Sequence, residues 1–574
     1  MIVLVGPAPA GRRLADQRHA LVATAHVRLV MLAILFAAVV TLVIGRLAWL
    51  GAVAEPATSR DAAAALVPLR ADIVDRHGTA LARTIDAWSI GVHPDKVIGD
   101  KDALAERLAE LMPDKTAAEY RRLLGLDAKF TYLNRRAMPE LVAAVNALGE
   151  PGIAFAREPE RLYPQSAMAA HVLGFLNIDG QGMRGMERVL NEQLTDPVTR
   201  GEPVALALDA RVQAAVESEL GQAMVNYHAK GAAGVVLDVH TGEIIALASL
   251  PAFNPNRVGR VGDDAMRNNV TQSVYELGST FKPIAMATAI NDGIVTDMGR
   301  RFDATSALQV GRYKIRDDHA TKRWLNIPEI LIHSSNIGTA RVADLIGQQR
   351  MERTFRRLGF DTPPDIELRE KGRSIWPTYW ARTTTMTVAY GHGIAVTPLH
   401  LASAYATLVN GGIWRPATLL RVKPGQAAEG RRVFSQATSD RLRQLLRLIV
   451  TDGTGRKAEA PGYRVGGKTG TAEVPQAGGY SRNRNVSTFA AAFPMDAPRY
   501  VVLMMIDSAE RVEANSFQTT AAYTAAPVVS RVIQRTGAML GVEPDTNRDV
   551  DLGDLRNVLW RAPGERSTAP SAAE

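Results

Sequence analysis

The chain has 574 residues, roughly four domain-sized units, and its 46% hydrophobic and 22% charged residues are typical of folded globular protein. The absence of cysteine excludes disulfides, thiolate metal sites and cysteine catalysis. The net charge of +8 would suit lipid headgroups, wall polymer or nucleic acid, but without an arginine-rich helix, zinc-ligand spacing or aromatic RNA-binding motif we predict no nucleic-acid partner.

The N-terminal part of the chain has the pattern of a membrane anchor. Residues 1–28 form a basic tail, residues 29–50 an apolar run long enough to span a bilayer, and residues 51–66 an alanine-rich linker. Because arginines precede the run and acidic residues follow it, the positive-inside rule predicts a cytoplasmic N-terminus. Ala52-Val53-Ala54 resembles a signal-peptidase site, but the length of the run favours an uncleaved anchor over cleavage there.

Residues 67–200 are predicted to form a non-catalytic pedestal domain, because they mix strand-like pieces with helices and contain no catalytic constellation. Helices are expected at 101–111, 116–124 and 138–148. Asp72, Asp75 and His77 lie close together in sequence. Turn carboxylates beside a solvated histidine explain them better than a metal site, because no complete ligand set recurs nearby.

Residues 201–540 are predicted to form a second domain, of the α+β class. The expected elements are a helix at 209–225, a hairpin of strands 234–239 and 244–248, a long helical block, and two closing strands at 486–493 and 500–507. This order predicts an antiparallel sheet with helices packed on its faces. Residues 541–574 are charged and then rich in Ser, Ala and Pro, so we expect a partly disordered tail.

The second domain contains one Ser-x-x-Lys, Ser279 to Lys282, followed by a predicted helix at 284–291. If Ser279 lies in the first turn, Lys282 lies on the same face, because residues three apart are neighbours on a helix. The free N–H groups of a helix N-terminus favour a developing alkoxide, and an adjacent amine can remove the hydroxyl proton. Ser279 is therefore a candidate nucleophile and Lys282 its base. Because a base must be neutral, we predict a lowered pKa for Lys282.

Two further motifs follow in order along the chain. Ser334-Ser335-Asn336 follows an apolar helical run, and Lys468-Thr469-Gly470 precedes the closing strands. Each motif alone is weak, since Ser481-Arg482-Asn483 also fits the second pattern but lies after the third. Ser-x-x-Lys, Ser-x-Asn and Lys-Thr-Gly in this order and at domain-scale spacing is the combination found in penicillin-binding proteins and class A β-lactamases.

In acyl transfer the residues of these two motifs would have separate tasks. Ser334 can relay a proton to the leaving amine, and Asn336 can hydrogen-bond a substrate amide or the lysine. Lys468 adds positive charge beside a substrate carboxylate, to which Thr469 and Thr471 offer hydroxyl groups. The backbone N–H groups of Ser279 and Thr471 form the candidate oxyanion hole, where each donor is worth about 3 kcal/mol of transition-state stabilisation.

One alternative overlaps the third motif. Residues 462–469 also match the nucleotide-binding P-loop pattern, which requires a strand before the loop and a helix that begins at its Lys-Thr. Pro475, Gly478 and Gly479 follow instead, and they do not make a helix. The sequence context therefore disfavours a nucleotide site.

The second domain resembles the transpeptidase domain of class B penicillin-binding proteins, and the likeness extends roughly from Val67 to Thr536. Beyond the three motifs it rests on residues 206–209, 238–246, 253–256, 390–393 and 397–399. The pedestal resembles that of the family at Arg161, Tyr163, Pro164, His171, Gly174 and residues 182–187. Ala71 departs from the usual Arg-Gly start of the family's pedestal, which affects only the expectation for its local backbone. Within the family the chain is most similar to the septal, division-specific branch.

The resemblance implies a D,D-transpeptidase that cross-links peptidoglycan stem peptides from a D-Ala-D-Ala donor through a serine acyl-enzyme, without cofactor or metal, and that β-lactams acylate. It implies residence in the bacterial inner membrane with a periplasmic catalytic domain, beside an FtsW-like glycan polymerase and other divisome membrane proteins. An elongation-type transpeptidase, a D,D-carboxypeptidase and a non-catalytic β-lactam or wall sensor stay open as alternatives. A β-lactamase is disfavoured, because residues 367–371 lack the asparagine of its usual Glu-x-x-x-Asn segment.

Overall fold

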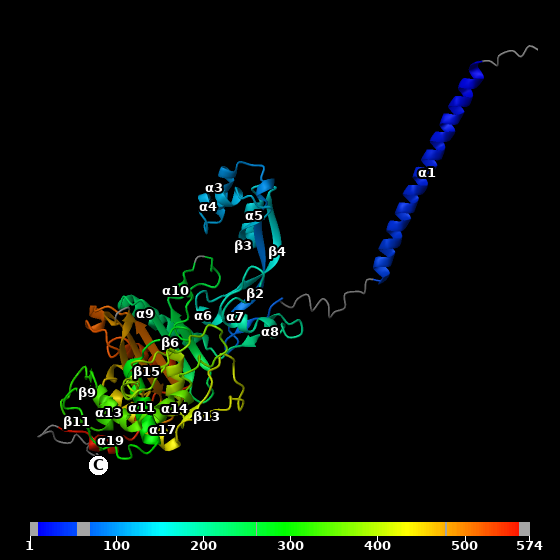
Figure 1. The fold of residues 1–574 in the computed structure, drawn as a ribbon. Helices are drawn as coiled ribbons and strands as arrows, with labels where there is room; N and C mark the ends of the chain where they lie inside the picture. The colour runs from blue at the N-terminus through cyan, green and yellow to red at the C-terminus, as the bar shows by residue number, and fades with distance from the viewer. Residues whose placement is uncertain (1–9, 54–68, 260, 477–478, 562–574) are drawn as a thin grey trace, which may run out of the picture. The chain divides into compact units, whose positions relative to one another are not determined.

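The structure is a computed structural model that describes residues 10–53, 69–259, 261–476 and 479–561. The chain forms two compact units, residues 1–67 and 68–574. The described part of the first unit is a single helix, α1 (Ala10–Val53) (Figure 1). Within α1, Val22–Arg46 is long and apolar enough to cross a membrane, which fits a single-pass anchor.

The bounds of this helix differ from the predicted ones. α1 continues without a break through the expected junction of basic tail and anchor at residues 28 and 29, and its apolar segment ends at Arg46, before residue 50. The guanidinium of Arg46 lies 4.4 Å from the ring centroid of Trp49, so the two side chains contact each other. The predicted linker lies largely outside the described residues.

The pedestal domain is built on a mixed sheet. Its strands are β1 (Ile73–Val74), β2 (Ala80–Val92), β3 (Thr131–Ala137), β4 (Ile153–Leu162) and β5 (Val204–Ala205). β2 pairs antiparallel with β1, β3 and β4, whereas β1 pairs parallel with β5. Because β5 follows residue 200, the pedestal sheet continues past the predicted boundary between the two domains.

Three helices confirm the expected helical stretches of the pedestal. They are α3 (Lys101–Leu111), α4 (Ala117–Leu124) and α5 (Pro139–Asn146). Thr116 and Glu119 form a capping box at the start of α4, which satisfies two backbone N–H groups. Leu108 of α3 and Tyr120 of α4 pack into one buried cluster with Ile90 of β2, so the helices are held by an apolar core.

Buried charges tie distant pedestal segments together. Glu187 has no exposed surface and accepts hydrogen bonds from Arg70 Nε and Arg161 Nε, each at 2.7 Å. Arg161 Nη1 also donates to the carbonyl of Ala71 at 2.8 Å, which fixes the backbone at the position where the sequence departs from the family pattern. Asp75 Oδ1 accepts from the N–H groups of residues 77 and 79, which confirms its prediction as a turn carboxylate.

The catalytic domain is organised on a five-stranded antiparallel sheet in the order β14-β15-β16-β6-β7. The strands are β6 (Gly231–Asp238), β7 (Ile244–Leu250), β14 (Gly466–Gln476), β15 (Gly479–Phe493) and β16 (Tyr500–Asp507). The predicted hairpin and closing strands are confirmed. The Lys-Thr-Gly motif lies on β14, an additional strand, so the P-loop alternative is wrong.

Helices cover both faces of this sheet, as predicted. One face packs on α9 (Ala210–Asn226) and α18 (Ala525–Thr536), and the other on α16 (Pro398–Val409) and α17 (Gln436–Asp452), against which α11 (Lys282–Asn291) packs in turn. Because successive strand residues point to opposite faces, Val236 belongs to the first core and Val235 to the second. The second core carries the helix that follows Ser279.

The start of the predicted tail packs on the catalytic domain. Residues 541–561 are described and include α19 (Gly553–Val558), whose Leu555 has no exposed surface. Asp549 forms an ion pair of 2.6 Å with Arg447 of α17. The expectation of disorder is therefore wrong for residues 541–561, while residues 562–574 lie outside the described part of the chain.

Candidate active site

Ser279 lies on a tight turn that leads into a buried helix. Residues Gly278–Phe281 form a 3-10 helix, η2, and α11 begins directly after it at Lys282, two residues before the predicted start. Pro283 stands in the first turn, where its missing N–H is not needed. Phe281 is fully buried and packs against Phe355 and Phe360 at ring-centroid distances of 5.7 and 5.3 Å. The packing of Phe281 therefore holds the turn in place, while Ser279 stays partly accessible to solvent.

Lys282 is completely buried and reaches the second motif. Its Nζ donates to the carbonyl of Ser334 at 2.5 Å and to Ser334 Oγ at 3.2 Å. Burial lowers the pKa of Lys282 to about 7, against the opposing charges of Asp317 and Asp318. The predicted lowering is confirmed. Among the described residues the hydrogen bonds of this ammonium group go to Ser334 and not to Ser279.

The second motif links two helices, α12 (Ile327–Ile332) and α13 (Asn336–Ile346). Ser334 has a φ of +57°, a left-handed conformation that a non-glycine residue keeps only when its surroundings enforce it. Ser335 caps α13 by accepting from Gly338 N at 2.9 Å and donates to Asp317 Oδ2 at 2.8 Å. Asn336 Nδ2 donates to the carbonyl of residue 316 at 3.1 Å.

Lys468 approaches the same serine from β14. Its Nζ is buried and donates to Ser334 Oγ and to the Thr469 carbonyl, both at 2.9 Å, and to Thr469 Oγ1 at 3.2 Å. Burial and then the nearby charge of Lys282 hold the pKa of Lys468 well below its usual value. All three motifs therefore meet at the Ser334 hydroxyl, which accepts from both lysines.

Two glycines let the backbone of β14 come close to the turn that carries Ser279, and a third lets another loop approach the same turn. A Cβ on Gly470 would lie 2.3 Å from the Leu277 carbonyl oxygen, and a Cβ on Gly278 would lie 2.9 Å from the Thr471 carbonyl oxygen. Gly391 is equally tight, because its Cβ would lie 2.2 Å from the Gly278 carbonyl oxygen. The turn that carries Ser279 and the backbone of Thr471 therefore lie side by side.

The hydroxyl groups of Thr469 and Thr471 are both held in place. Thr469 Oγ1 lies 3.0 Å from Thr454 Oγ1, and Thr471 Oγ1 accepts from Ala521 N at 3.0 Å. Because this contact uses Thr471 as an acceptor, its O–H stays available to donate to an anionic group. Further along β14, a cavity of about 400 Å³ is lined in part by Glu276, Glu473 and Val474.

Several residues of the site were not identified from the sequence. Asp317 accepts from Ser335 and from Ile337 N at 2.9 Å, and its charge acts on Lys282. Tyr405 donates to the Thr280 carbonyl at 2.9 Å and so supports the nucleophile turn from α16. Thr454 holds Thr469. None of them belongs to a recurring pattern, and only the tertiary fold brings them to the site.

Comparisons with known proteins agree with this geometry. Residues 232–534 match the Penicillin binding protein transpeptidase domain, and residues 65–196 match the Penicillin-binding Protein dimerisation domain. The chain is 40% identical to the probable peptidoglycan D,D-transpeptidase FtsI of Caulobacter vibrioides, over 83% of this chain and 82% of that protein. It is 29% identical to the peptidoglycan D,D-transpeptidase FtsI of Escherichia coli K12, over 83% and 84% respectively.

A solved structure has the same fold. The apo form of penicillin-binding protein 3 from Mycobacterium tuberculosis matches with a TM-score of 0.65 at 25% identity, over 83% of this chain and 97% of that one. The order of a dimerisation domain and then a transpeptidase domain agrees with the pedestal and catalytic domains described above. On these grounds the chain belongs to the class B penicillin-binding proteins, serine-type peptidoglycan D,D-transpeptidases of the FtsI type.

Proposed function

We propose that this chain is the membrane-anchored transpeptidase of septal wall synthesis and that Ser279 is its acyl-enzyme nucleophile. The observation that carries the assignment of roles is the Ser334 hydroxyl, held between two buried lysines beside the turn of Ser279. The 40% identity to the FtsI protein of Caulobacter vibrioides supports the division role.

In the acylation step Ser279 Oγ attacks the carbonyl carbon of the penultimate D-Ala, and its proton passes to neutral Lys282 Nζ. With a pKa of about 7, a large fraction of Lys282 is neutral under ordinary conditions. The backbone N–H groups of Ser279 and Thr471 stabilise the oxyanion. Ser334 then passes a proton to the departing amine and takes one back from protonated Lys282, the peptide bond breaks, and the terminal D-Ala leaves.

Substrate recognition falls to the residues around this centre. Lys468 supplies positive charge toward the terminal carboxylate, and Thr469 and Thr471 donate hydrogen bonds to it. Asn336, at the start of α13, binds a peptide amide. In the second step an amine of a neighbouring stem peptide attacks the ester carbonyl, forms the cross-link and returns the proton to Ser279 Oγ. A β-lactam follows the first step only, because its amide nitrogen stays attached to the acyl group.

Labelling with fluorescent penicillin tests the nucleophile in the full-length protein. Ser279→Ala should abolish the covalent label, whereas Ser306→Ala, at an exposed serine, should label like the wild type. Persistent labelling of Ser279→Ala would refute the assignment. A reconstituted assay on lipid-linked substrate with an FtsW-like polymerase then separates cross-linked product from trimmed product, which a carboxypeptidase would give, and from no turnover, which a sensor would give.

The cellular role and the orientation need separate experiments. The basic residues before the apolar segment of α1 support a cytoplasmic N-terminus and a periplasmic catalytic domain. A fluorescent fusion should gather at midcell during division. Location along the sidewall would favour the elongation-type alternative.

A further inference from the structure

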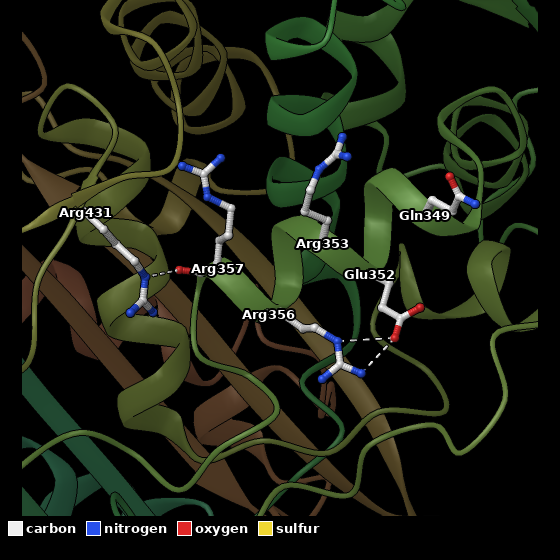
Figure 2. A pocket seen from close by; sticks show the side chains of 6 residues that line it. All are labelled: Gln349, Glu352, Arg353, Arg356, Arg357 and Arg431. Carbon is white, nitrogen blue, oxygen red and sulfur yellow. Dashed lines mark hydrogen bonds and ion pairs between the residues drawn. The ribbon is translucent and has the colours of Figure 1, made fainter.

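Arginines gather on the exposed face of α14 (Gln348–Arg357), opposite the face on which Met351, Thr354 and Phe355 are buried. A cavity of about 500 Å³ opens on this exposed face. It is lined by Gln349, Glu352, Arg353, Arg356, Arg357 and Arg431 (Figure 2). We call these four arginines the arginine cluster. Glu352 is the one carboxylate that lines the cavity with them.

The cluster is only partly neutralised. Arg356 pairs with Glu352 at 2.8 Å and with Asp361 at 2.7 Å. Arg353 lies 3.5 Å from Asp292, a carboxylate that Arg350 shares at 3.8 Å.

Two members of the cluster are held by backbone instead. Arg431 Nε donates to the carbonyl of Arg357 at 2.7 Å, and Arg357 Nη2 donates to the carbonyl of Arg432. Within the described ranges, neither Arg357 nor Arg431 contacts a carboxylate in an ion pair. These two guanidinium groups are therefore positioned without being neutralised.

Repulsion between like charges in the arginine cluster lowers the stability of this surface. Arg353 and Arg357 are four residues apart on one helix face, where like charges repel. Figure 2 shows their side chains extending toward the same side of α14, whereas Arg356 turns to Glu352. Burial lowers the pKa of Arg431; the charges of Asp365 and Asp361 oppose this shift, and the charge of Arg357 adds to it. A second positive group thus already acts on Arg431, and an anion placed between them would relieve the repulsion.

Arg431 also has a fixed place at the junction of two cavities. Its guanidinium carbon lies 3.6 Å from the ring centroid of Trp414, so the planar group is stacked before any ligand arrives. A neighbouring cavity of about 320 Å³ shares Arg431 with the first and is also lined by Trp414, Pro363, Pro364, Asp365 and Lys371. A ligand held by Arg431 would therefore have room for an uncharged body beside its charged group.

We propose that the arginine cluster binds a multiply charged phosphoryl group. Guanidinium groups present paired N–H donors that match phosphate oxygens, and several incompletely neutralised arginines fit a group with two or more negative charges better than a single carboxylate. Such a group occurs both on anionic lipid headgroups and on soluble phosphorylated molecules. The site is separate from the chemistry at Ser279 and does not depend on it.

Calorimetric titration of the full-length protein in nonionic detergent with inorganic pyrophosphate tests the site. The wild type should show saturable binding of one ligand. Changing Arg353, Arg357 and Arg431 together to Gln should weaken binding by about tenfold or more, because it removes charge-assisted hydrogen bonds. The control changes three exposed arginines elsewhere, Arg300→Gln, Arg312→Gln and Arg511→Gln, and should shift affinity by less than about twofold, since distant surface charges are screened.

A gain-of-affinity variant makes the test independent of any folding defect in the triple variant. Glu352→Gln removes the one carboxylate of the lining and leaves Arg356 with Asp361 alone as its ion-pair partner, so pyrophosphate should bind more tightly. Equal weakening in the cluster and control variants, absence of saturation, or unchanged affinity in Glu352→Gln would overturn the proposal.

Short-chain phosphatidic acid, whose phosphomonoester can carry two negative charges, distinguishes the two sources of the phosphoryl group, with phosphatidylcholine as its zwitterionic control. Preference for the anionic lipid over pyrophosphate supports a site for the membrane surface. The reverse preference supports a site for a soluble phosphorylated ligand.

Discussion

The Ser334 hydroxyl oxygen accepts hydrogen bonds from two buried lysines at once, 2.9 Å from Lys468 Nζ and 3.2 Å from Lys282 Nζ. Burial lowers the pKa of both lysines, and the positive charge of Lys282 lowers that of Lys468 further. The left-handed backbone of Ser334 places its hydroxyl between them. A serine in this position can exchange a proton with either lysine without any side-chain displacement.

The pH dependence of acylation follows from this pairing. The base must be neutral, and the pKa of Lys282 is about 7, so the rate of penicillin acylation should rise with pH through about 7 and then level off. Asp317 raises this pKa, and Asp317→Asn should therefore move the midpoint to lower pH. Asp179→Asn, at an exposed pedestal carboxylate, is the control and should leave the midpoint unchanged. A midpoint near that of an ordinary lysine would contradict Lys282 as the base.

At the scale of residues, the sequence predicted the motif residues but not the residues, such as Asp317, that hold them in place. Ser279, Lys282, Ser334 and Lys468 stand in patterns whose spacing identifies them, and the structure brings the side chains of the last three together. The contact of Asp317 with the second motif was not predictable, because an aspartate in the loop before a capped helix belongs to no distinctive sequence pattern.

At the scale of elements, the position of β14 determines how closely the third motif approaches the turn that carries Ser279. Among the described strands it pairs only with β15. Its other edge has no partner strand among the described residues and lies beside the turn that carries Ser279. We did not predict this strand, because Gly466, Gly467, Gly470 and Pro475 have low strand propensity. Pairing with β15 overrides that propensity. Gly470 is nevertheless required, because its missing Cβ lets the strand lie against Leu277 and Thr280 at η2.

Gly470→Ala should therefore separate β14 from the turn that carries Ser279. The added Cβ would meet the Leu277 carbonyl oxygen at 2.3 Å, and overpacking of this kind costs about 1–3 kcal/mol. Chemical denaturation should show that loss, and the penicillin acylation rate should fall steeply. Gly221→Ala, inside α9 with no atom within 4 Å of its Cβ, is the matched control and should be neutral or stabilising. Normal acylation by Gly470→Ala would show that the close approach is not required.

For the whole molecule, the order of elements predicted the α+β class, because a hairpin, a helical block and closing strands leave few other arrangements. The path of the C-terminal segment was not predictable, since its charged composition reads as disorder. Its aspartates are instead partners of arginines on α17, as in the pairs Asp549–Arg447 and Asp554–Arg441. Composition records the charges, but only the fold shows which of them are paired.

The same segment supports the second motif. Trp560 N donates to Glu329 Oε1 at 2.8 Å, and Asn326 Nδ2 donates to the Val558 carbonyl at 2.6 Å. Asn326 and Glu329 form the capping box of α12, the helix that leads to Ser334. The end of the described chain therefore holds the start of the helix that leads to Ser334.

A stop codon after Val542 should destabilise the catalytic domain and slow its acylation. It removes buried Leu555 and deprives the largely buried Arg447 of Asp549, losses that cost about 2–5 kcal/mol each in comparable sites. Thermal unfolding should shift to a clearly lower temperature, and penicillin labelling should slow because α12 loses its partners at residues 558 and 560. A stop codon after Arg561 keeps every one of these contacts and should match the full-length chain. If both truncations unfold at the same temperature, the C-terminal segment does not support the site.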